Sequence, residues 1–154
     1  MHVSAKSDYA VRAVVELAAA GGERCHREAV AGAQDIPLNF LENILLALRR
    51  AGIVASRRGP EGGYWLARPA RAVTVADVIR AVDGPLAAVR GAPPELTRYA
   101  GTARPLQEVW IALRTNLREV LEGVTIADLV AGELPPRVAQ LAGEAESWTT
   151  RTLA

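Results

Sequence analysis

The sequence predicts a mainly helical protein that carries one small β-hairpin. Apolar residues recur at three- and four-residue spacing in several segments, which is the period of an α-helix. Two short segments of strand-forming residues flank a Gly-Pro-Glu-Gly-Gly turn at 59–63, which favours a chain reversal. Half of the 154 residues are hydrophobic but only 5% are aromatic, which favours closely packed helices over a sheet sandwich.

Composition excludes several classes of protein. The 18 basic and 17 acidic side chains give a formal net charge of +1, so the chain is neither histone-like nor an acidic tail. The single cysteine, Cys25, can form neither a disulfide within the chain nor a structural zinc site. No segment reaches the roughly 18 uninterrupted apolar residues of a membrane span, and the N-terminus lacks the pattern of a signal peptide. We therefore expect a soluble, cytoplasmic protein that does not bind a membrane.

The first two helices are predicted from periodicity and from the residues that end them. Apolar residues spaced by three and four predict a helix over about 5–20, which Gly21 and Gly22 then end. A short second helix is expected over about 27–33, followed by a tight turn.

The third helix has the clearest amphipathic pattern. Pro37 suits its first helical position, where a missing N–H costs nothing, and Gly52 ends it. Its core-facing stripe is predicted to be Phe40, Leu41, Ile44, Leu45 and Leu48. The opposite face is polar and consists of Asn39, Glu42, Asn43, Arg49 and Arg50.

Strand candidates at 53–58 and 64–68 predict a hairpin directly after this helix. Two short helices followed by a hairpin are the layout of a winged helix-turn-helix, whose second helix reads the major groove of DNA. Between Arg49 and Arg71 there are six arginines and one acid, a local net charge of +5 that leaves −4 for the rest of the chain. The sequence therefore predicts a DNA-binding domain over 1–84.

A fourth helix and a long loop follow the hairpin. Thr74 and Asp77 have the spacing of a capping box, and Gly84-Pro85 ends the helix that they begin. Residues 85–104 contain several glycines and prolines, which predict a loop.

The longest helix is predicted to begin at Pro105 and to run to about 122. A second capping signal at Thr125 begins a short helix, and we assign 105–132 to dimerisation because so apolar a helix needs a partner surface. Periodicity is weak over 133–154, so we expect this tail to dock loosely or fray. The predicted dimer interface is Leu106, Val109, Trp110, Leu113, Asn116, Leu117, Val120 and Leu121.

Three segments carry a long combined motif. Residues 36–45 read Ile-Pro-Leu-Asn-Phe-Leu-Glu-Asn-Ile-Leu, residues 51–59 read Ala-Gly-Ile-Val-Ala-Ser-Arg-Arg-Gly, and residues 62–67 read Gly-Gly-Tyr-Trp-Leu-Ala. This motif resembles the Rrf-two (Rrf2) family of winged helix-turn-helix transcription regulators, over about residues 1–131. Members that sense through an iron–sulphur cluster carry three cysteines between the fourth and the long helix, whereas residues 85–104 contain none. The chain thus resembles a member without the cluster, and we expect no cofactor.

The candidate DNA contacts follow from the polar face of the third helix and from the hairpin. Asn39 and Asn43 suit adenine, and Glu42 suits the amino group of cytosine. Arginines at the wing suit phosphates or the minor groove, whereas last-turn arginines suit DNA and the helix dipole equally. The predicted set is Ser4, Lys6, Pro37, Leu38, Asn39, Glu42, Asn43, Arg49, Arg50, Ser56, Arg57, Arg58 and Gly59.

Cys25 has two interpretations. As a small, half-buried side chain it is structural, which is the interpretation we favour. As a thiol beside Arg24 and Arg27 it would have a lowered pKa and would act as a single-thiol redox sensor.

The expected function is that of a homodimeric, sequence-specific regulator, a repressor that binds a palindromic operator in double-stranded DNA. An enzyme is not expected, because the chain has only two histidines and its glycine-rich turn lacks the spacing and lysine of a phosphate loop. The effector is unknown; Arg98, Tyr99 and Arg104 are candidates to line its pocket, although a solvated loop is favoured. The alternative is a winged-helix module that binds protein.

Overall fold

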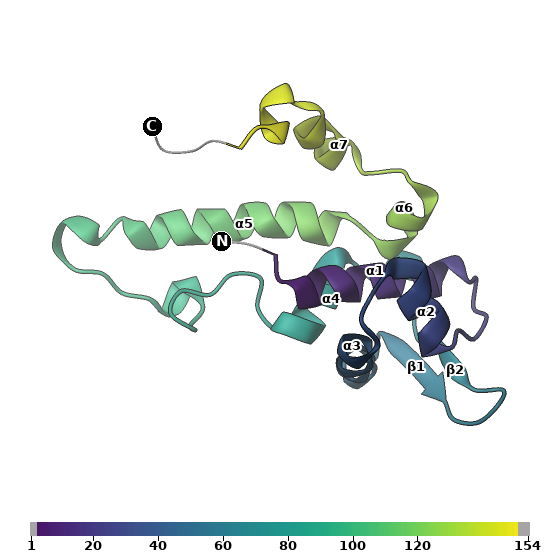
Figure 1. The fold of residues 1–154 in the computed structure, drawn as a ribbon. Coiled ribbons are helices and arrows are strands. Elements are labelled where there is room, and N and C mark those ends of the chain that lie inside the picture. Colours follow the sequence, from purple (N-terminus) through teal and green to yellow (C-terminus); the bar gives the residue numbers. More distant parts are fainter. Residues whose placement is uncertain (1–2, 151–154) are drawn as a thin grey trace.

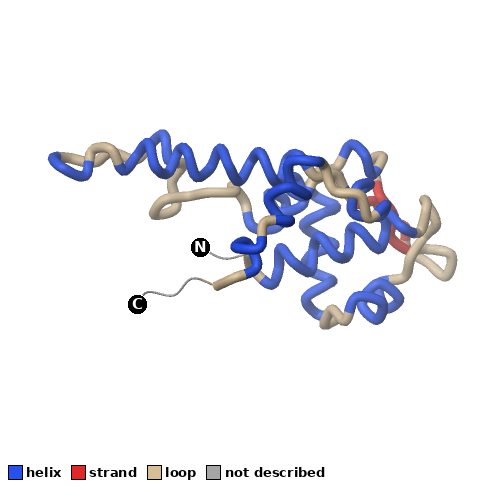
Figure 2. Tube along the Cα trace, turned by 90° about the horizontal axis from the view of Figure 1, so that it is seen from above, coloured by secondary structure: helices blue, strands red, loops and turns tan. Residues whose placement is uncertain are grey.

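The computed structural model describes residues 3–150, so the extreme ends of the two terminal segments lie outside the described residues. A helical unit with a hairpin occupies one end of the molecule, and the long helix α5 extends from it (Figure 1). Figure 2 shows the hairpin at the opposite end of the molecule from the beginning of α5. The elements are α1 (Ala5–Ala19), α2 (Arg27–Gln34), α3 (Leu38–Arg50), β1 (Val54–Arg57), β2 (Gly63–Leu66), α4 (Val75–Asp83), α5 (Leu106–Gly123), α6 (Ile126–Ala131) and α7 (Pro136–Gly143).

Helix α1 is the centre of the helical unit, because it packs against α2, α3, α4 and α6. Ser4 caps it by accepting a hydrogen bond from the amide of Ser7 at 2.9 Å. Small buried residues on α1, among them Ala10 and Ala13, allow the neighbouring helices to approach closely. The larger buried side chains around them are Val14, Leu17, Leu41, Ile44, Leu45 and Leu48.

Helix α3 differs from its predicted form at two residues. Pro37 precedes the helix as its cap, with a ψ of 128°, and the first helical residue is Leu38. The carbonyl of Pro37 nevertheless accepts a hydrogen bond from the amide of Leu41 at 3.1 Å, so the proline still fixes where the helix begins. Phe40 was predicted to be buried but is 49% exposed, because it lies at the edge of the stripe. Its ring meets the edge of Tyr9, with 6.1 Å between the centroids.

The predicted hairpin is confirmed, and a residue before α2 pairs with its second strand. Strands β1 and β2 are antiparallel, with Val54 opposite Leu66 and a tight turn beyond Arg57. Cys25, between α1 and α2, pairs with Tyr64: each amide donates to the other residue's carbonyl, at 2.9 and 2.8 Å. The segment before α2 is thereby fixed against the wing.

Helices α4 and α6 begin in the same way. Thr74 accepts from the amide of Asp77 at 3.1 Å, and the Asp77 carboxylate accepts from the amide of Thr74 at 3.1 Å, so the predicted capping box is confirmed. Thr125 and Asp128 form the same reciprocal pair at the start of α6.

The starts of α4 and α6 are also joined to each other. Val75 donates to the carbonyl of Val124 at 3.0 Å, and Ile126 donates to the carbonyl of Val73 at 2.9 Å. Ile126 is fully buried in the same core as α1 and α3. The C-terminal end of α5 is therefore anchored to the helical unit.

The tail is more regular than the weak periodicity indicated. Helix α7 lies against α5, and Arg137 pairs with Glu119 at 3.2 Å. None of its residues is buried, which explains why the sequence pattern was weak. Among the residues that the structure describes, no helix has the length and apolar character needed to cross a bilayer.

Candidate DNA-binding surface

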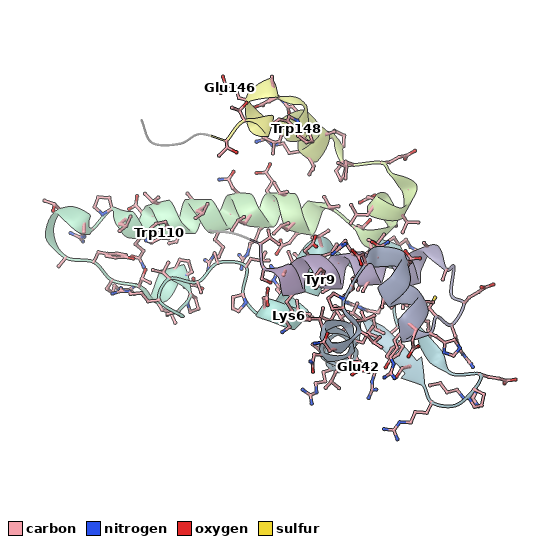
Figure 3. The ribbon with its side chains drawn as sticks, viewed as in Figure 1. Lys6, Tyr9, Glu42, Trp110, Glu146 and Trp148 are labelled. Atoms are coloured by element: carbon pink, nitrogen blue, oxygen red, sulfur yellow. The ribbon has the colours of Figure 1, made fainter. Side chains whose placement is uncertain are left out.

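The outer face of α3 projects from the helical unit on the side away from α5 (Figures 1 and 3). Thirteen residues of α-helix extend about 20 Å, enough to follow a major groove. Asn43 donates from its side chain to the carbonyl of Asn39 at 3.1 Å, so the two amides stand one turn apart on one face. The predicted residues exposed on this face are Pro37, Leu38, Asn39, Glu42, Asn43, Arg49 and Arg50.

A basic groove lies between the end of α3 and the wing. Arg49 donates to the hydroxyl of Ser56 at 3.2 Å, which links α3 to β1. The groove has a volume of about 450 Å³ and includes one acidic side chain, Glu28, in its lining. Its remaining lining residues are His26, Arg27, Arg49, Ser56, Arg57, Arg58, Gly59, Gly63 and Tyr64.

The wing's turn depends on two adjacent glycines. A Cβ on Gly62 would overlap the carbonyl oxygen of Arg57 and would lie 2.7 Å from that of Gly59. Gly63 has a φ of +142° and faces the carbonyl of Cys25, where a Cβ would lie 2.9 Å away. The turn that presents Arg57 and its neighbour therefore cannot carry a side chain at these positions without shifting.

Arg27 also belongs to this surface, although the sequence indicated it only as a neighbour of the Cys25 thiol. Its guanidinium contacts the Glu42 carboxylate at 2.6 Å and the Glu28 carboxylate at 2.8 Å. The hydrogen bond to Arg27 lowers the pKa of Glu28. Glu42 is thus held by a cation from α2 through one of its two carboxylate oxygens, which leaves the other oxygen to accept from a cytosine. No local sequence signal indicates this position, because the pairing of Cys25 with Tyr64 is what brings the segment beside the wing.

Ser4 and Lys6 are engaged elsewhere. Their side chains donate to the Asp83 carboxylate and to the carbonyl of Val82 respectively, at the end of α4 (Figure 3 labels Lys6). Ser7 also donates to Asp83, at 2.6 Å. The hydrogen bonds from Ser4 and Ser7 lower the pKa of Asp83. Contact of either side chain with phosphate stays a prediction, and it would require these bonds to be exchanged.

The surroundings of the Cys25 thiol disfavour its thiolate form. Burial, followed by the charges of Glu16 and Glu23, raises its pKa. The basic neighbours are directed elsewhere: Arg24 lies over the ring of Trp65 at 5.4 Å, and Arg27 is held by the two glutamates. The lowering of the pKa anticipated from these arginines is therefore wrong, because neighbours in sequence point away from the sulphur.

Helix α5 presents its predicted interface residues in two groups. Leu117 and Leu121 face the helical unit and line a hollow with Ile79 of α4. Val109 is 54% exposed, and no residue of α5 is buried within the chain. The exposed or half-buried interface candidates are Leu106, Val109, Trp110, Leu113, Asn116, Leu117, Val120 and Leu121.

Comparison with known proteins identifies the family. The family model described as "Rrf2: Iron-dependent Transcriptional regulator" matches residues 3–132. The chain belongs to the Rrf2 family. It is accordingly a helix-turn-helix transcriptional regulator whose partner is DNA, and it is not an enzyme.

Individual Rrf2 proteins are similar over most of their length. Rv1287 of Mycobacterium tuberculosis, named as an HTH-type transcriptional regulator, is 50% identical over 94% of this chain and 90% of its own. The regulator IscR of Cereibacter sphaeroides is 35% identical over 88% of this chain and 91% of its own. The structure titled as CymR, the global cysteine regulator of B. subtilis, superposes with a TM-score of 0.71 and 30% identity, covering 86% of this chain and 98% of that one. The mainly helical winged fold is thereby confirmed.

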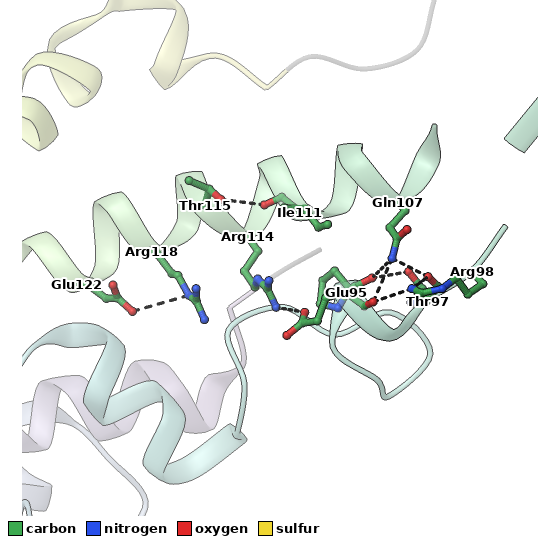
Figure 4. A network of polar contacts seen from close by, with 10 residues as sticks. Glu95, Thr97, Arg98, Gln107, Ile111, Arg114, Thr115, Arg118 and Glu122 are labelled. Atoms are coloured by element: carbon green, nitrogen blue, oxygen red, sulfur yellow. Dashed lines mark hydrogen bonds and ion pairs between the residues drawn. The ribbon is translucent and has the colours of Figure 1, made fainter. Parts of the chain in front are cut away.

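The iron in the Rrf2 family's description does not fit the residues present here. Residues 85–104 contain no cysteine. Within the described range 3–150, no group of three or more His, Cys, Asp or Glu side chains is placed to hold a metal ion. The loop is instead bound to α5 by polar contacts (Figure 4): Gln107 donates to the carbonyls of Pro94, Glu95 and Thr97, and Arg114 pairs with Glu95.

Proposed function

We propose that the chain is a homodimeric repressor that binds a palindromic operator through α3 and the wing. The observation that carries this proposal is the basic groove between Arg49 and the wing, at the C-terminal end of the helix whose exposed face carries the amides of Asn39 and Asn43. A polar helix face reads base edges, while arginines next to it neutralise phosphates and fix the register.

The roles of the individual side chains follow from their positions. Asn39 and Asn43 carry amides that suit adenine, and Leu38, 37% exposed at the start of α3, suits a thymine methyl group. Arg57 and Arg58 stand at the wing, where they suit phosphate or a narrow minor groove. Glu42 orients Arg27 in the free protein, which makes Arg27 a further candidate for contact with phosphate.

Dimerisation through α5 is supported by its unburied apolar residues away from the 85–104 loop, such as Val109, which is 54% exposed. No residue of this helix is buried by its own chain, and an apolar helix of 18 residues is favoured to pair with a second copy. A twofold axis at α5 would relate two copies of α3, so the operator is expected to be an inverted repeat with half-sites spaced by about 34–36 Å or a multiple of it.

Repression is proposed because occupation of a promoter requires no contact beyond those to the operator. The alternative of a winged-helix module that binds protein in place of DNA is not retained, because the chain belongs to a family of transcriptional regulators and its groove is basic. The test is a footprint on genomic fragments together with sedimentation of the free and bound protein. A symmetric footprint occupied by two chains is expected; an asymmetric site bound by one chain would contradict the proposal. Reporter transcription in the presence of the protein then separates repression from activation.

A further inference from the structure

The loop over 85–104 and the first half of α5 line a cavity of about 280 Å³ that is open to solvent on one side. Val89, Pro94, Trp110 and Leu113 supply its larger apolar walls, and Arg90 is the one charged residue in its lining. Figure 3 places Trp110 on the side of α5 that faces this loop. The volume lies near the lower end of the about 300–1,000 Å³ typical of ligand pockets, which suits a molecule with one ring or one branched chain.

The backbone at Arg90 is unusual for an arginine. Its φ is +55° and that of Gly91 is +78°, while Val89 and Ala92 exchange two hydrogen bonds, at 2.8 and 3.1 Å, across this pair. A two-residue turn with both φ values positive favours Gly, Asn or Asp, because a Cβ is crowded there. The chain thus places a long cation at the cavity where a glycine would fit with less strain.

The charge of Arg90 is not neutralised by a neighbouring carboxylate. None of the ion pairs within the described residues involves it, whereas Arg114 pairs with Glu95 and Arg80 with Glu122. Its guanidinium lies 5.7 Å from the centroid of the Tyr99 ring, and the hydroxyl of Tyr99 accepts from Trp110 at 3.0 Å. The cavity lining therefore includes a cation, Arg90, and one aromatic ring, Trp110, and both contact Tyr99 just outside it.

We propose that this cavity binds a small organic carboxylate with a single aromatic or branched apolar group. The apolar group packs against Trp110 and Leu113, and the carboxylate accepts two hydrogen bonds from Arg90. This inference deepens the proposed function by naming the chemical class of an effector, and it rests on that function only for an effect on DNA binding. The cavity lies between this loop and α5, and the segment from Pro85 to the cavity connects its loop wall directly to the end of α4 in the DNA-binding unit.

The test is calorimetry of the full chain with phenylacetate, benzoate and isovalerate, and with phenylacetamide as an uncharged analogue. At least one carboxylate is expected to bind saturably, and phenylacetamide to bind about tenfold more weakly or worse. Arg90→Gly suits the positive φ, so the variant is expected to fold and to lose at least about tenfold in carboxylate affinity. Arg98, Tyr99 and Arg104, which the sequence offered as candidates for an effector pocket, are all absent from the lining of this cavity. Arg104→Gln, a charge loss at an exposed residue of the same loop, is therefore expected to bind like the wild type.

Several outcomes would overturn the proposal. They are the absence of saturable binding for all three carboxylates, equal binding of the amide, or full retention of binding by folded Arg90→Gly. A second copy that fills the cavity would give the first of these. Operator binding is measured in parallel without carboxylate, which separates the two claims. A protein that binds the operator but no probe contradicts this inference alone, and one that binds a probe but no DNA contradicts the proposed function alone.

Discussion

The guanidinium of Arg27 on α2 contacts the carboxylate of Glu42 on α3 at 2.6 Å, which joins the two helices of the helix-turn-helix on their exposed side. Both side chains are nearly half exposed, so the pair contributes little to stability by itself. We expect its effect to be on DNA binding, because contacts of Arg27 or Glu42 with DNA compete with this pair.

Glu42→Gln should free the Nη1 end of the Arg27 guanidinium for contact with phosphate, while its Nε still contacts Glu28. We expect the slope of log affinity against log salt to steepen by about 0.9 per protomer on random DNA, because each added phosphate contact displaces counterions. Salt titrations of the variant and the wild type measure this change. An unchanged slope together with a lost preference at one base pair would instead make Glu42 a reader of cytosine.

Arg58→Ala and Asn39→Ala should separate positioning from reading. The arginine variant should lose affinity for all sequences and reduce the salt slope by about 0.9 per protomer. The asparagine variant should lose about 1–3 kcal/mol per half-site at one base pair, with random DNA unaffected. Arg104→Gln provides the same loss of charge away from this surface. Equal losses on operator and random DNA in both variants would contradict direct readout.

Gly62→Ala should disrupt the wing while leaving the helical core intact. The new methyl group would meet the carbonyl oxygens of Arg57 and Gly59, so the turn must shift, at a cost on the order of 1–3 kcal/mol. Gly32→Ala is the matched control: in α2 nothing lies within 4 Å of the new Cβ, and we expect stabilisation by about 0.4–1 kcal/mol. Thermal unfolding and operator affinity of both variants check this; a wild-type affinity of Gly62→Ala would show that the wing does not touch DNA.

The contact of Asp83 with Ser7 predicts a dependence of stability on pH. Hydrogen bonds from Ser4 and Ser7 lower the pKa of Asp83 in the folded chain. The resulting stabilisation is present above the unfolded pKa of about 3.9 and is lost as the pH falls through the lower folded pKa. Asp83→Asn should therefore melt below the wild type at pH 7, and the difference should shrink below about pH 4. A constant difference in Tm down to pH 2 would contradict this linkage.

Cys25→Ser should leave DNA binding unchanged with and without peroxide. The raised pKa of the thiol disfavours the thiolate that peroxide attacks. Operator affinity is measured for both proteins under both conditions. A loss that occurs only in oxidised wild type would make Cys25 a switch despite its surroundings.

Local signals were sufficient to predict much of the fold. The spacing of Thr74 and Asp77 predicted a reciprocal cap that the structure contains, since both partners lie within one turn. The glycines at 62 and 63 predicted the chain reversal for the same reason. Leu41 and Leu48 were correctly placed in the core because helical periodicity is a property of the segment itself.

Contacts between distant segments were beyond such signals. Periodicity could not show that Phe40 lies at the edge of the buried stripe, because that depends on where α1 crosses α3. The pairing of Cys25 with Tyr64 joins residues 39 positions apart and leaves no pattern in either segment. The sequence therefore does not indicate Arg27 as part of the basic groove. It predicts that Lys6 contacts phosphate, whereas the Lys6 side chain reaches the end of α4.

The bridge between Thr74 and Thr125 holds the C-terminal end of α5 against the start of α4, so that α5 can tilt about this end. Eighteen helical residues extend about 27 Å, so a tilt of about 5° at the fixed end would displace the other end by about 2 Å. In a dimer formed through α5, that displacement would alter the distance between the two copies of α3 by an amount comparable to the rise of one base pair. An operator lengthened or shortened by a single base pair thus measures how stiff this junction is.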